Sequence, residues 1–256
     1  MPSQPGLSMR YSDVTPVSGK VQLHYDEIAG VYDKRYDENR GRFYYTHITR
    51  HIMEGFVNEG RLLDLGCGTG LFLQRYLEHG GSGTGLDISR GMLEKASCRC
   101  PSSRFIIGTA EALPFRDRSF DAVSSILSFS YFKEPEETLS EVYRVLAPGG
   151  SIGVCTLGRN IFTRGLPAIY QISEVMNIKK ACHGAFGERY YSVGEMETML
   201  SDAGFTDVAV RRCSFAHYDL ADPIFGLAQK IEPFVEQKIP YLAYNICAKG
   251  KKPVQS

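Results

Sequence analysis

The sequence predicts an α/β fold in which a doubly wound, mostly parallel sheet carries helices on both faces. Five short apolar stretches alternate with segments of helical periodicity, and a pair of apolar stretches follows near the end of the chain. A glycine-rich turn also joins the first of these stretches directly to a helical segment. No linker or internal repeat divides the 256 residues, so we expect one large domain.

Composition excludes several classes of protein. Lys plus Arg and Asp plus Glu both number 29, and this balance argues against a nucleic-acid-binding protein held by phosphate contacts. We find no apolar run of membrane-spanning length and no signal-peptide pattern. The 7 cysteines are scattered without a Cys-x-x-Cys pair, which predicts neither a disulfide framework nor a metal site. We therefore expect a cytoplasmic enzyme with reduced thiols.

The N-terminal part of the chain changes character once. Residues 1–20 are rich in Ser, Pro and Gly and predict a flexible tail, so the domain is expected over residues 21–256. Within its helical first part, residues 21–58, aromatic and apolar side chains share one side at helical spacing: Tyr25, Ile28, Ala29, Tyr32 and Tyr36. This helix either packs on the core or forms a lid over a ligand. We favour the lid, with Tyr25 and Tyr32 as contacts.

The stretch 62–70 is the centre of the predicted fold. It reads as a buried strand that contains Asp64 and runs into a turn with Gly66, Gly68 and Gly70, after which a helix begins. Glycines permit positive φ angles and a close approach of a ligand to the backbone. The unpaired N–H groups of the helix start attract the negative end of a ligand. A glycine turn alone is also compatible with a purely structural tight turn, which is the less favoured alternative.

A second strand, residues 83–88, ends in a carboxylate. Asp87 at the tip of this strand is placed to accept hydrogen bonds from both hydroxyls of a ribose, and Ser89 is a plausible cap for the next helix. The glycine spacing is Gly-x-Gly-x-Gly, whereas dinucleotide enzymes use Gly-x-Gly-x-x-Gly. Asp64 would repel a pyrophosphate but suits a cationic amino acid group. A nicotinamide dehydrogenase is therefore disfavoured, and another nucleoside-bearing ligand is expected.

On these motifs the sequence resembles the class I S-adenosylmethionine-dependent methyltransferases. It is most similar to their small-molecule branch, which includes the menaquinone and ubiquinone C-methyltransferases, from about Tyr25 to the end. Three further motifs support the resemblance: Tyr-Asp-x-Ile-Ala-x-x-Tyr-Asp from Tyr25, Ala-Glu-x-Leu-Pro-Phe from Ala110 and Leu-x-Pro-Gly-Gly from Leu146. The resemblance implies a Rossmann-like sheet of seven strands, the last one antiparallel, and an N-terminal cap over the cofactor.

The resemblance also implies a cofactor, S-adenosylmethionine, which leaves as S-adenosylhomocysteine. The expected cofactor contacts are Tyr25, Tyr32, Asp64, Leu65, Gly66, Gly68, Gly70, Asp87, Ile88, Thr109, Ala110, Glu111, Ser125, Ile126 and Leu127. Asp64 would lie near the ammonium group, Asp87 would hold the ribose, and Ile88 would pack on adenine. Residues 109–111 would lie along the edge of the adenine base, and residues 125–127 would pass beneath the methionine part.

The chain departs from its relatives at two places. Thr109 stands where an aspartate is usual, which leaves its contact with the adenine amino group open. Many relatives have histidines near Ser130 and Tyr131, but this chain has none there. No residue is therefore predicted as a catalytic base, with Tyr131, His183 and His217 as weak candidates.

Residues 157–191 lack the core pattern and are expected to form a helical insertion over the carboxyl edge of the sheet. In related enzymes that region builds the acceptor pocket, and the candidates to line it are Tyr170, His183, Tyr190 and Tyr191. The predicted reaction is in-line methyl transfer to a small-molecule acceptor.

Two alternatives to this function remain open. One is a module that binds the cofactor without catalysis and acts through a partner. The other is an arsenite methyltransferase whose thiolates would be Cys155, Cys182 and Cys213. The sequence identifies neither the acceptor nor the oligomeric state.

Overall fold

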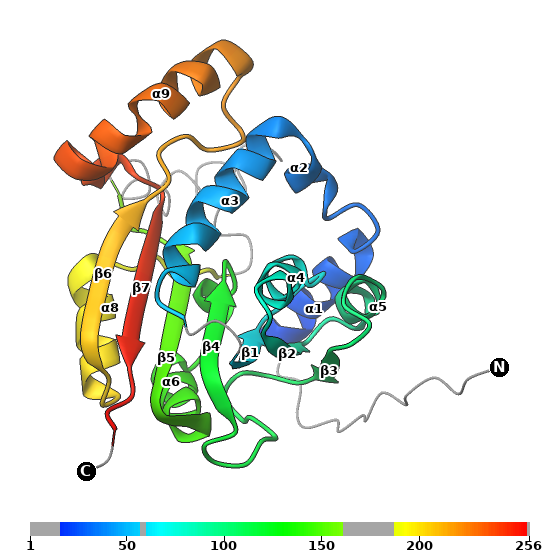
Figure 1. Cartoon of the computed structure of the whole chain (residues 1–256). Coiled ribbons are helices and arrows are strands. Elements are labelled where there is room, and N and C mark those ends of the chain that lie inside the picture. Colours follow the sequence, from blue (N-terminus) through cyan, green and yellow to red (C-terminus); the bar gives the residue numbers. More distant parts are fainter. Residues whose placement is uncertain (1–15, 57–59, 161–186, 255–256) are drawn as a thin grey trace.

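The protein is built around one seven-stranded sheet with the strand order β3-β2-β1-β4-β5-β7-β6 (Figure 1). The computed structural model describes residues 16–56, 60–160 and 187–254. The strands are β1 (Arg61–Leu65), β2 (Ser82–Asp87), β3 (Arg104–Ile107), β4 (Phe120–Ile126), β5 (Leu146–Leu157), β6 (Thr206–Cys213) and β7 (Asn245–Lys251). The α-helices are α1 (Pro16–Ile28), α2 (Lys34–Asp37), α3 (Asn39–Met53), α4 (Leu71–Glu78), α5 (Arg90–Arg99), α6 (Pro135–Val145), α8 (Val193–Asp202) and α9 (Asp222–Lys238).

The strand directions confirm the predicted doubly wound sheet. The first five strands pair in parallel, and the order reverses direction between β1 and β4. The last strand, β7, runs antiparallel between β5 and β6, as the resemblance implied. In an open sheet of this kind, ligands bind beyond the carboxyl ends of the strands at the point where the order reverses.

Side-chain alternation along the strands builds a separate hydrophobic core on each face of the sheet. Leu62 and Cys155 contribute to the core beneath α3 and α4. Their neighbours Leu63 and Val154 point to the other face, where α6 and α8 pack. Successive strand residues face opposite sides, so one apolar run supplies both cores. Continuous apolar runs are therefore expected in these central strands.

Two predicted helix starts are confirmed by their caps. The Ser89 hydroxyl accepts a hydrogen bond from the backbone N–H of Met92 at the start of α5. Ser192 and Glu195 form a reciprocal capping box at the start of α8. Each cap pairs backbone N–H groups that the first helical turn leaves without partners. The end of β2 is thus followed at once by a firmly anchored helix.

The N-terminal region differs from the prediction in its boundaries. Helix α1 begins at Pro16, inside the stretch assigned to the tail, because proline is well suited to the first turn of a helix. The described part of the expected segment, residues 21–56, contains three helices, and α2 and α3 are separated by Glu38 in an extended conformation. Of the expected insertion, Tyr170 and His183 lie outside the described residues.

No helix in the described part of the chain is both long and apolar enough to cross a membrane.

Candidate functional site

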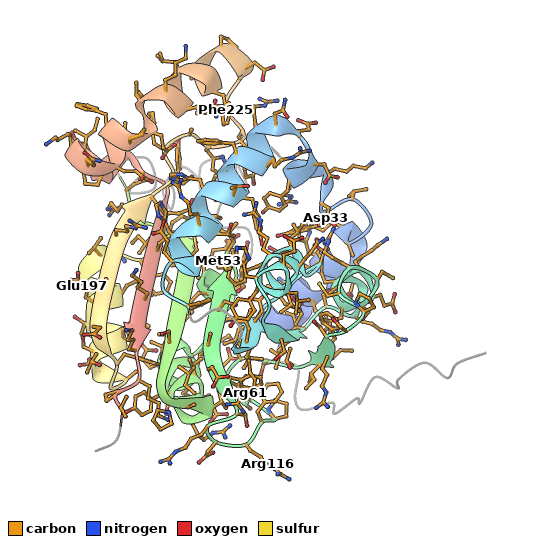
Figure 2. The ribbon with its side chains drawn as sticks, in the orientation of Figure 1. Asp33, Met53, Arg61, Arg116, Glu197 and Phe225 are labelled. Carbon is orange, nitrogen blue, oxygen red and sulfur yellow. The ribbon has the colours of Figure 1, made fainter. Side chains whose placement is uncertain are left out.

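A cavity of about 820 Å³, counted with the space at its mouth, lies at the carboxyl ends of β1, β2, β3 and β4. Each of these strands contributes the residues that end or follow it, and α1 covers the cavity with Val21 and Tyr25. The labelled residues Arg61 and Arg116 mark the opposite edge of the sheet (Figure 2). The cavity therefore occupies the place where a parallel sheet of this order binds its ligand.

Asp87 is the charged group at the end of β2. Its two carboxylate oxygens accept hydrogen bonds from the backbone N–H groups of Gly68 and Ser89, both at 2.8 Å. Burial raises the pKa of Asp87 to about 6, although these two bonds oppose the shift. Each carboxylate oxygen has a further lone pair for a ligand. Asp87 is thus a fixed acceptor that is ionised at neutral pH.

The glycine turn after β1 needs its glycines for two different reasons. Gly66 has a φ of 64°, and a Cβ there would lie 2.4 Å from the Cβ of Ser128. Gly68 has a φ of 53°, and a Cβ there would meet nothing within 4 Å. Gly66 therefore permits tight packing against the end of β4, whereas Gly68 leaves backbone exposed to the cavity.

The end of β4 forms the opposite wall. Leu127 has a φ of 59°, which is unusual for a residue with a side chain, and its N–H donates to the carbonyl of Cys155. The next residue, Ser128, donates from its hydroxyl to the carbonyl of Leu65 at 2.7 Å. The Ser125 hydroxyl lies 2.7 Å from that of Ser128. These contacts hold the ends of β1 and β4 together. Unusual backbone angles of this kind are common beside ligand sites.

Tyrosines close the cavity from the N-terminal side. The rings of Tyr25 and Tyr32 contact each other edge to face with their centroids 6.0 Å apart. Tyr25 makes the same kind of contact with Tyr131, at 5.9 Å. All three line the cavity, and burial raises the pKa of each phenol above its usual value. They are neutral hydroxyl groups at physiological pH.

The two aspartates next to these tyrosines fasten the N-terminal helices to the rest of the fold. Asp26 accepts hydrogen bonds from the Ser89 hydroxyl at 2.6 Å and the Gly91 N–H at 2.9 Å. Asp33, labelled in Figure 2, accepts from the Thr69 hydroxyl at 2.6 Å and pairs with Arg99 at 2.8 Å. We call these two sets of contacts the clasps. Each Tyr-Asp pair thus places a ring in the cavity wall and ties its own backbone to a helix start.

Asp64 lies beneath the glycine turn and not in the cavity wall. It is 2% exposed, and the hydroxyl of Ser124 donates a hydrogen bond to it at 2.6 Å. Burial raises the pKa of Asp64 to about 7, and the nearby charge of Asp87 adds to the effect. Ionisation of this group is therefore sensitive to a positive charge brought close to it.

The structure brings most of the predicted contact residues together in the cavity wall: Tyr25, Tyr32, Gly66, Gly68, Asp87, Ile88, Thr109, Ala110, Glu111, Ile126 and Leu127. Four predicted residues lie behind this wall: Asp64, Leu65, Gly70 and Ser125. The sequence did not reveal Val21 or Lys133 as wall residues. Lys133 comes with the loop after β4, where its N–H donates to Glu111. The clasp role of Asp26 and Asp33 was also missed, although both belong to the quoted Tyr-Asp motif.

A second cavity of about 900 Å³ adjoins the first and shares part of its wall. The shared residues are Tyr25, Tyr32, Leu127 and Tyr131. Beyond them the second cavity is lined by more tyrosines, Arg35, Glu188 and two histidines. The guanidinium of Arg35 lies 4.5 Å from the centroid of the Tyr32 ring. The predicted weak base candidates Tyr131 and His217 both line this cavity, whereas Tyr190 and Tyr191 line neither cavity.

Comparison with known proteins decides which family has this geometry. Residues 63–154 match a family described as a methyltransferase domain. A demethylmenaquinone methyltransferase of Renibacterium salmoninarum is 34% identical over 171 residues, which is 61% of this chain and 71% of the relative. The chain is a class I S-adenosylmethionine-dependent methyltransferase.

Two further relatives of this methyltransferase differ in the acceptor that their names give. A malonyl-[acyl-carrier protein] O-methyltransferase of Serratia marcescens is 38% identical over 97 residues, 38% of each chain. A Thermotoga maritima structure described as a "SAM-dependent methyltransferase, possible histamine N-methyltransferase" is 25% identical with a TM-score of 0.66. It covers 90% of this chain and 99% of its own.

The first cavity of the methyltransferase fits S-adenosylmethionine. Asp87 supplies two fixed oxygen acceptors, as the two ribose hydroxyls require. Ile88, Leu86 and Met92 provide an apolar wall for a planar base. The backbone exposed at Gly68 leaves room for the amino acid end. When bound, the cofactor supplies a methyl group on a positively charged sulfur.

Proposed function

We propose that the methyltransferase transfers a methyl group to a small molecule with a flat, apolar body and polar substituents, which binds in the second cavity. The observation that supports this most strongly is the wall shared by the two cavities. A donor in the first cavity and an acceptor in the second would meet between the tyrosine rings and Leu127.

The lining of the second cavity supports the proposed acceptor class. Six tyrosines contribute ring faces and hydroxyl groups: Tyr25, Tyr32, Tyr36, Tyr44, Tyr131 and Tyr218. Aromatic side chains of this kind contact flat molecules with their faces and satisfy polar substituents with their hydroxyl groups. Arg35 and Glu188 add charges of both signs. A bulky or uniformly charged acceptor is therefore disfavoured.

In the first cavity we propose that the cofactor lies across the carboxyl ends of the strands. Asp87 accepts from the ribose hydroxyls, Ile88 packs on the base, and residues 109–111 edge it. The methionine end lies over the glycine turn, and Asp64 beneath that turn favours the ammonium charge. The N-terminal segment forms a lid, because both clasps hold its tyrosines against the cavity.

The proposed chemistry is an in-line displacement, and the chain contributes mainly by positioning. Holding two reactants aligned and about 3 Å apart removes several kcal/mol from the barrier. The tyrosines exclude water from the region between the cavities, while Leu127 fixes the wall behind the reacting groups. The phenols of Tyr25 and Tyr131 have raised pKa values, so they are suited to donate hydrogen bonds and poorly suited to act as bases.

The proposal is tested in two stages. First, thermal unfolding is measured with S-adenosylmethionine, S-adenosylhomocysteine and NAD⁺, and we expect the two sulfur nucleosides to raise the Tm by several degrees. Second, a panel of aromatic acceptors is incubated with the cofactor, and S-adenosylhomocysteine and methylated product are measured by mass spectrometry. Cofactor binding without turnover on any flat acceptor would favour the alternative of a module that acts through a partner.

Six free cysteines in the described chain also favour a reducing, cytoplasmic compartment. Arsenite is not favoured as the acceptor. Cys155 and Cys213 do come together, but neither of them lines the two cavities, and Cys182 lies outside the described residues.

A further inference from the structure

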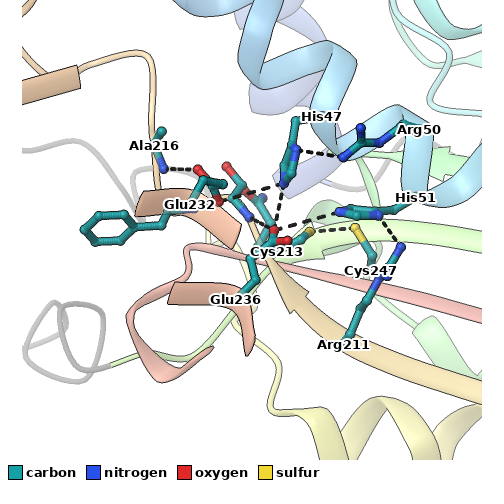
Figure 3. A network of polar contacts seen from close by, with 12 residues as sticks. His47, Arg50, His51, Arg211, Cys213, Ala216, Glu232, Glu236 and Cys247 are labelled. Atoms are coloured by element: carbon teal, nitrogen blue, oxygen red, sulfur yellow. Dashed lines mark hydrogen bonds and ion pairs between the residues drawn. The ribbon is translucent and has the colours of Figure 1, made fainter. Parts of the chain in front are cut away.

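Three cysteines from the last three strands meet inside the protein. Cys155 on β5, Cys213 on β6 and Cys247 on β7 have their sulfur atoms within 4.8 Å of one another. We call these three residues the cysteine cluster. Each is at most 4% exposed, and all three face the core beneath α3. The close-up in Figure 3 shows Cys213 and Cys247 beside the side chains of His51 and Arg211.

The positions of the three sulfurs follow from the sheet. Cys155 and Cys247 are directly paired across β5 and β7. Cys213 lies on the other neighbour of β7, where it is paired with Asn245, two residues before Cys247. Side chains two residues apart share a face, so all three thiols point to the same side of the sheet. A rigid scaffold therefore holds three sulfur ligands together.

The three thiols are not joined by a disulfide bond. The sulfurs of Cys213 and Cys247 are 2.7 Å apart, longer than the about 2.05 Å of a disulfide bond. Three free thiols held this close together form the kind of ligand set that binds thiophilic metal ions.

A buried histidine nitrogen lies beside the cysteine cluster. His51 is 7% exposed, and its Nδ1 is hydrogen-bonded to Arg211. Its Nε2 has no hydrogen-bond partner among the described residues, the nearest carboxylate oxygen being that of Glu236 at 3.8 Å. A buried polar atom without a partner is costly and calls for an explanation. The side chain of His51 lies beside Cys247 (Figure 3), so this nitrogen is a candidate for a further ligand atom, in competition with its contact to Glu236.

A route from solvent reaches the same place. A surface cavity of about 460 Å³ is lined by His51, Arg211 and Cys247, among other residues of α3, β6 and β7. It is separate from both cavities described above, because no wall residue is shared. An ion could therefore enter from solvent without passing through the proposed active site.

We propose that the cysteine cluster binds one thiophilic divalent ion, Zn²⁺, as three thiolates, with His51 or a solvent molecule from the surface cavity as the fourth ligand. Zinc sites in proteins are tetrahedral, with Zn–S distances of about 2.3 Å and therefore sulfurs about 3.8 Å apart. Cys213 and Cys247, now 2.7 Å apart, would separate by about 1 Å to reach that spacing, and all three sulfurs already lie within 4.8 Å of one another. Binding forms three Zn–S bonds and releases the three thiol protons to solvent, without any change in oxidation state.

The site is distinct from the proposed reaction. None of the three cysteines lines either of the cavities that we assign to cofactor and acceptor. The bound ion would instead join β5, β6 and β7 to one another. A zinc ion in that place stabilises the antiparallel edge of the sheet. The nearby group of His47, His51 and Glu236 is a weaker candidate, since Glu236 already bonds to His47 and to the Ser214 N–H.

The test uses the full-length protein, reduced and treated with a chelator that is then removed. We expect it to bind one equivalent of Zn²⁺ with a dissociation constant below about 1 µM. Co²⁺ as a probe should give the intense absorption of thiolate coordination and be displaced by Zn²⁺. Addition of Zn²⁺ should raise the Tm by several degrees, and chelator should reverse the shift. This last measurement needs no variant.

Variants then locate the ion. Cys213→Ala and Cys247→Ala should each weaken binding at least 100-fold and abolish the Co²⁺–thiolate band. Cys100→Ala removes a buried cysteine outside the cluster and should leave both unchanged. His47→Gln disrupts the competing histidine group and should also retain the ion. Failure of the reduced wild type to bind Zn²⁺, or unchanged binding in the cysteine variants, would overturn the proposal. A disulfide between Cys213 and Cys247 that persists after treatment with a thiol reductant would also overturn it.

Discussion

The first cavity and the cysteine cluster lie on the same sheet but are built in opposite ways. The cavity is made of residues that end or follow consecutive strands, including the glycine turn and Asp87. The cysteine cluster takes one side chain from the interior or end of each of three strands that are far apart in the sequence. Backbone groups and a carboxylate determine the first cavity. The cysteine cluster depends instead on the register in which β5, β6 and β7 pair. The two regions should therefore respond to different substitutions.

We expect the largest effect from Asp87→Ala, which should weaken cofactor binding in the first cavity without affecting the cysteine cluster. On the proposed assignment, this variant would lose two charge-assisted hydrogen bonds to the ribose, each worth about 1.5–3 kcal/mol. Cofactor affinity measured by calorimetry should fall at least about 100-fold, while Zn²⁺ binding stays unchanged. Asp121→Ala is the matched control, because Asp121 pairs with Arg61 away from the cavity. Equal cofactor affinity in the Asp87 variant would refute the ribose assignment.

The next effect tests whether backbone geometry determines the first cavity. In Gly66→Ala the new Cβ would collide with Ser128, and the positive φ adds about 1–2 kcal/mol of strain. We expect a loss of about 3 kcal/mol in the free energy of unfolding, measured with denaturant, together with weaker cofactor binding. Gly194→Ala has open space and no positive φ, so it should be close to neutral. Similar stability of the two variants would contradict this account.

A third effect concerns the buried Asp64. The pKa of its carboxyl is about 7 in the folded protein, against 3.8 without the fold. The folded state therefore holds the proton more firmly, and stability falls as pH rises from about 4 to 8, by roughly 2–4 kcal/mol. Asp64→Asn should remove this decline and be the more stable protein above pH 7 without cofactor. Parallel Tm–pH curves for the two proteins would show that Asp64 ionises normally.

The smallest effect concerns the clasps. Asp26→Ala removes two hydrogen bonds between α1 and the start of α5 without touching the cavity wall. The cofactor dissociation rate should rise about 10-fold, which corresponds to roughly 1.4 kcal/mol. The exposed neighbour Glu27 provides a control in Glu27→Ala. Stopped-flow measurement of the cofactor dissociation rate compares the two variants. Identical rates would mean that α1 only packs against the fold and does not act as a lid.

The difference between the first cavity and the cysteine cluster also explains which features could be predicted from the sequence. The strand-turn-helix at residues 62–70 and the acid at Asp87 are contiguous motifs, and their backbone geometry follows from residue type. The alternating strands and helices and the helix caps at Ser89 and Ser192 were predictable for that reason. The seven-stranded order and most of the cavity wall were predicted from the resemblance to the methyltransferases. Conversely, the sequence predicted no metal site, because Cys155, Cys213 and Cys247 share no local pattern. Only the pairing of β5, β6 and β7 brings them together.

Errors in the N-terminal region have a different physical origin. Helix α1 starts at Pro16 within a stretch whose composition resembles a linker. A few tertiary contacts, such as those of Asp26, outweigh the weak local preference. The Tyr-Asp motif predicted that its tyrosines contact a ligand, but it gave no sign that the adjacent Asp33 would bind Thr69 and Arg99. Partners of a side chain distant in sequence are determined by the assembled fold.

The clasps have a consequence for the timing of the catalytic cycle. If the N-terminal helices act as the proposed lid, the contacts of Asp26 and Asp33 have to break before S-adenosylhomocysteine can leave. Each additional hydrogen bond in the clasps would lengthen the residence time of the product. Lid opening limits turnover in many enzymes. Opening of the lid would then limit the steady-state rate of this methyltransferase. The rate of methyl transfer itself could be measured only in the first turnover.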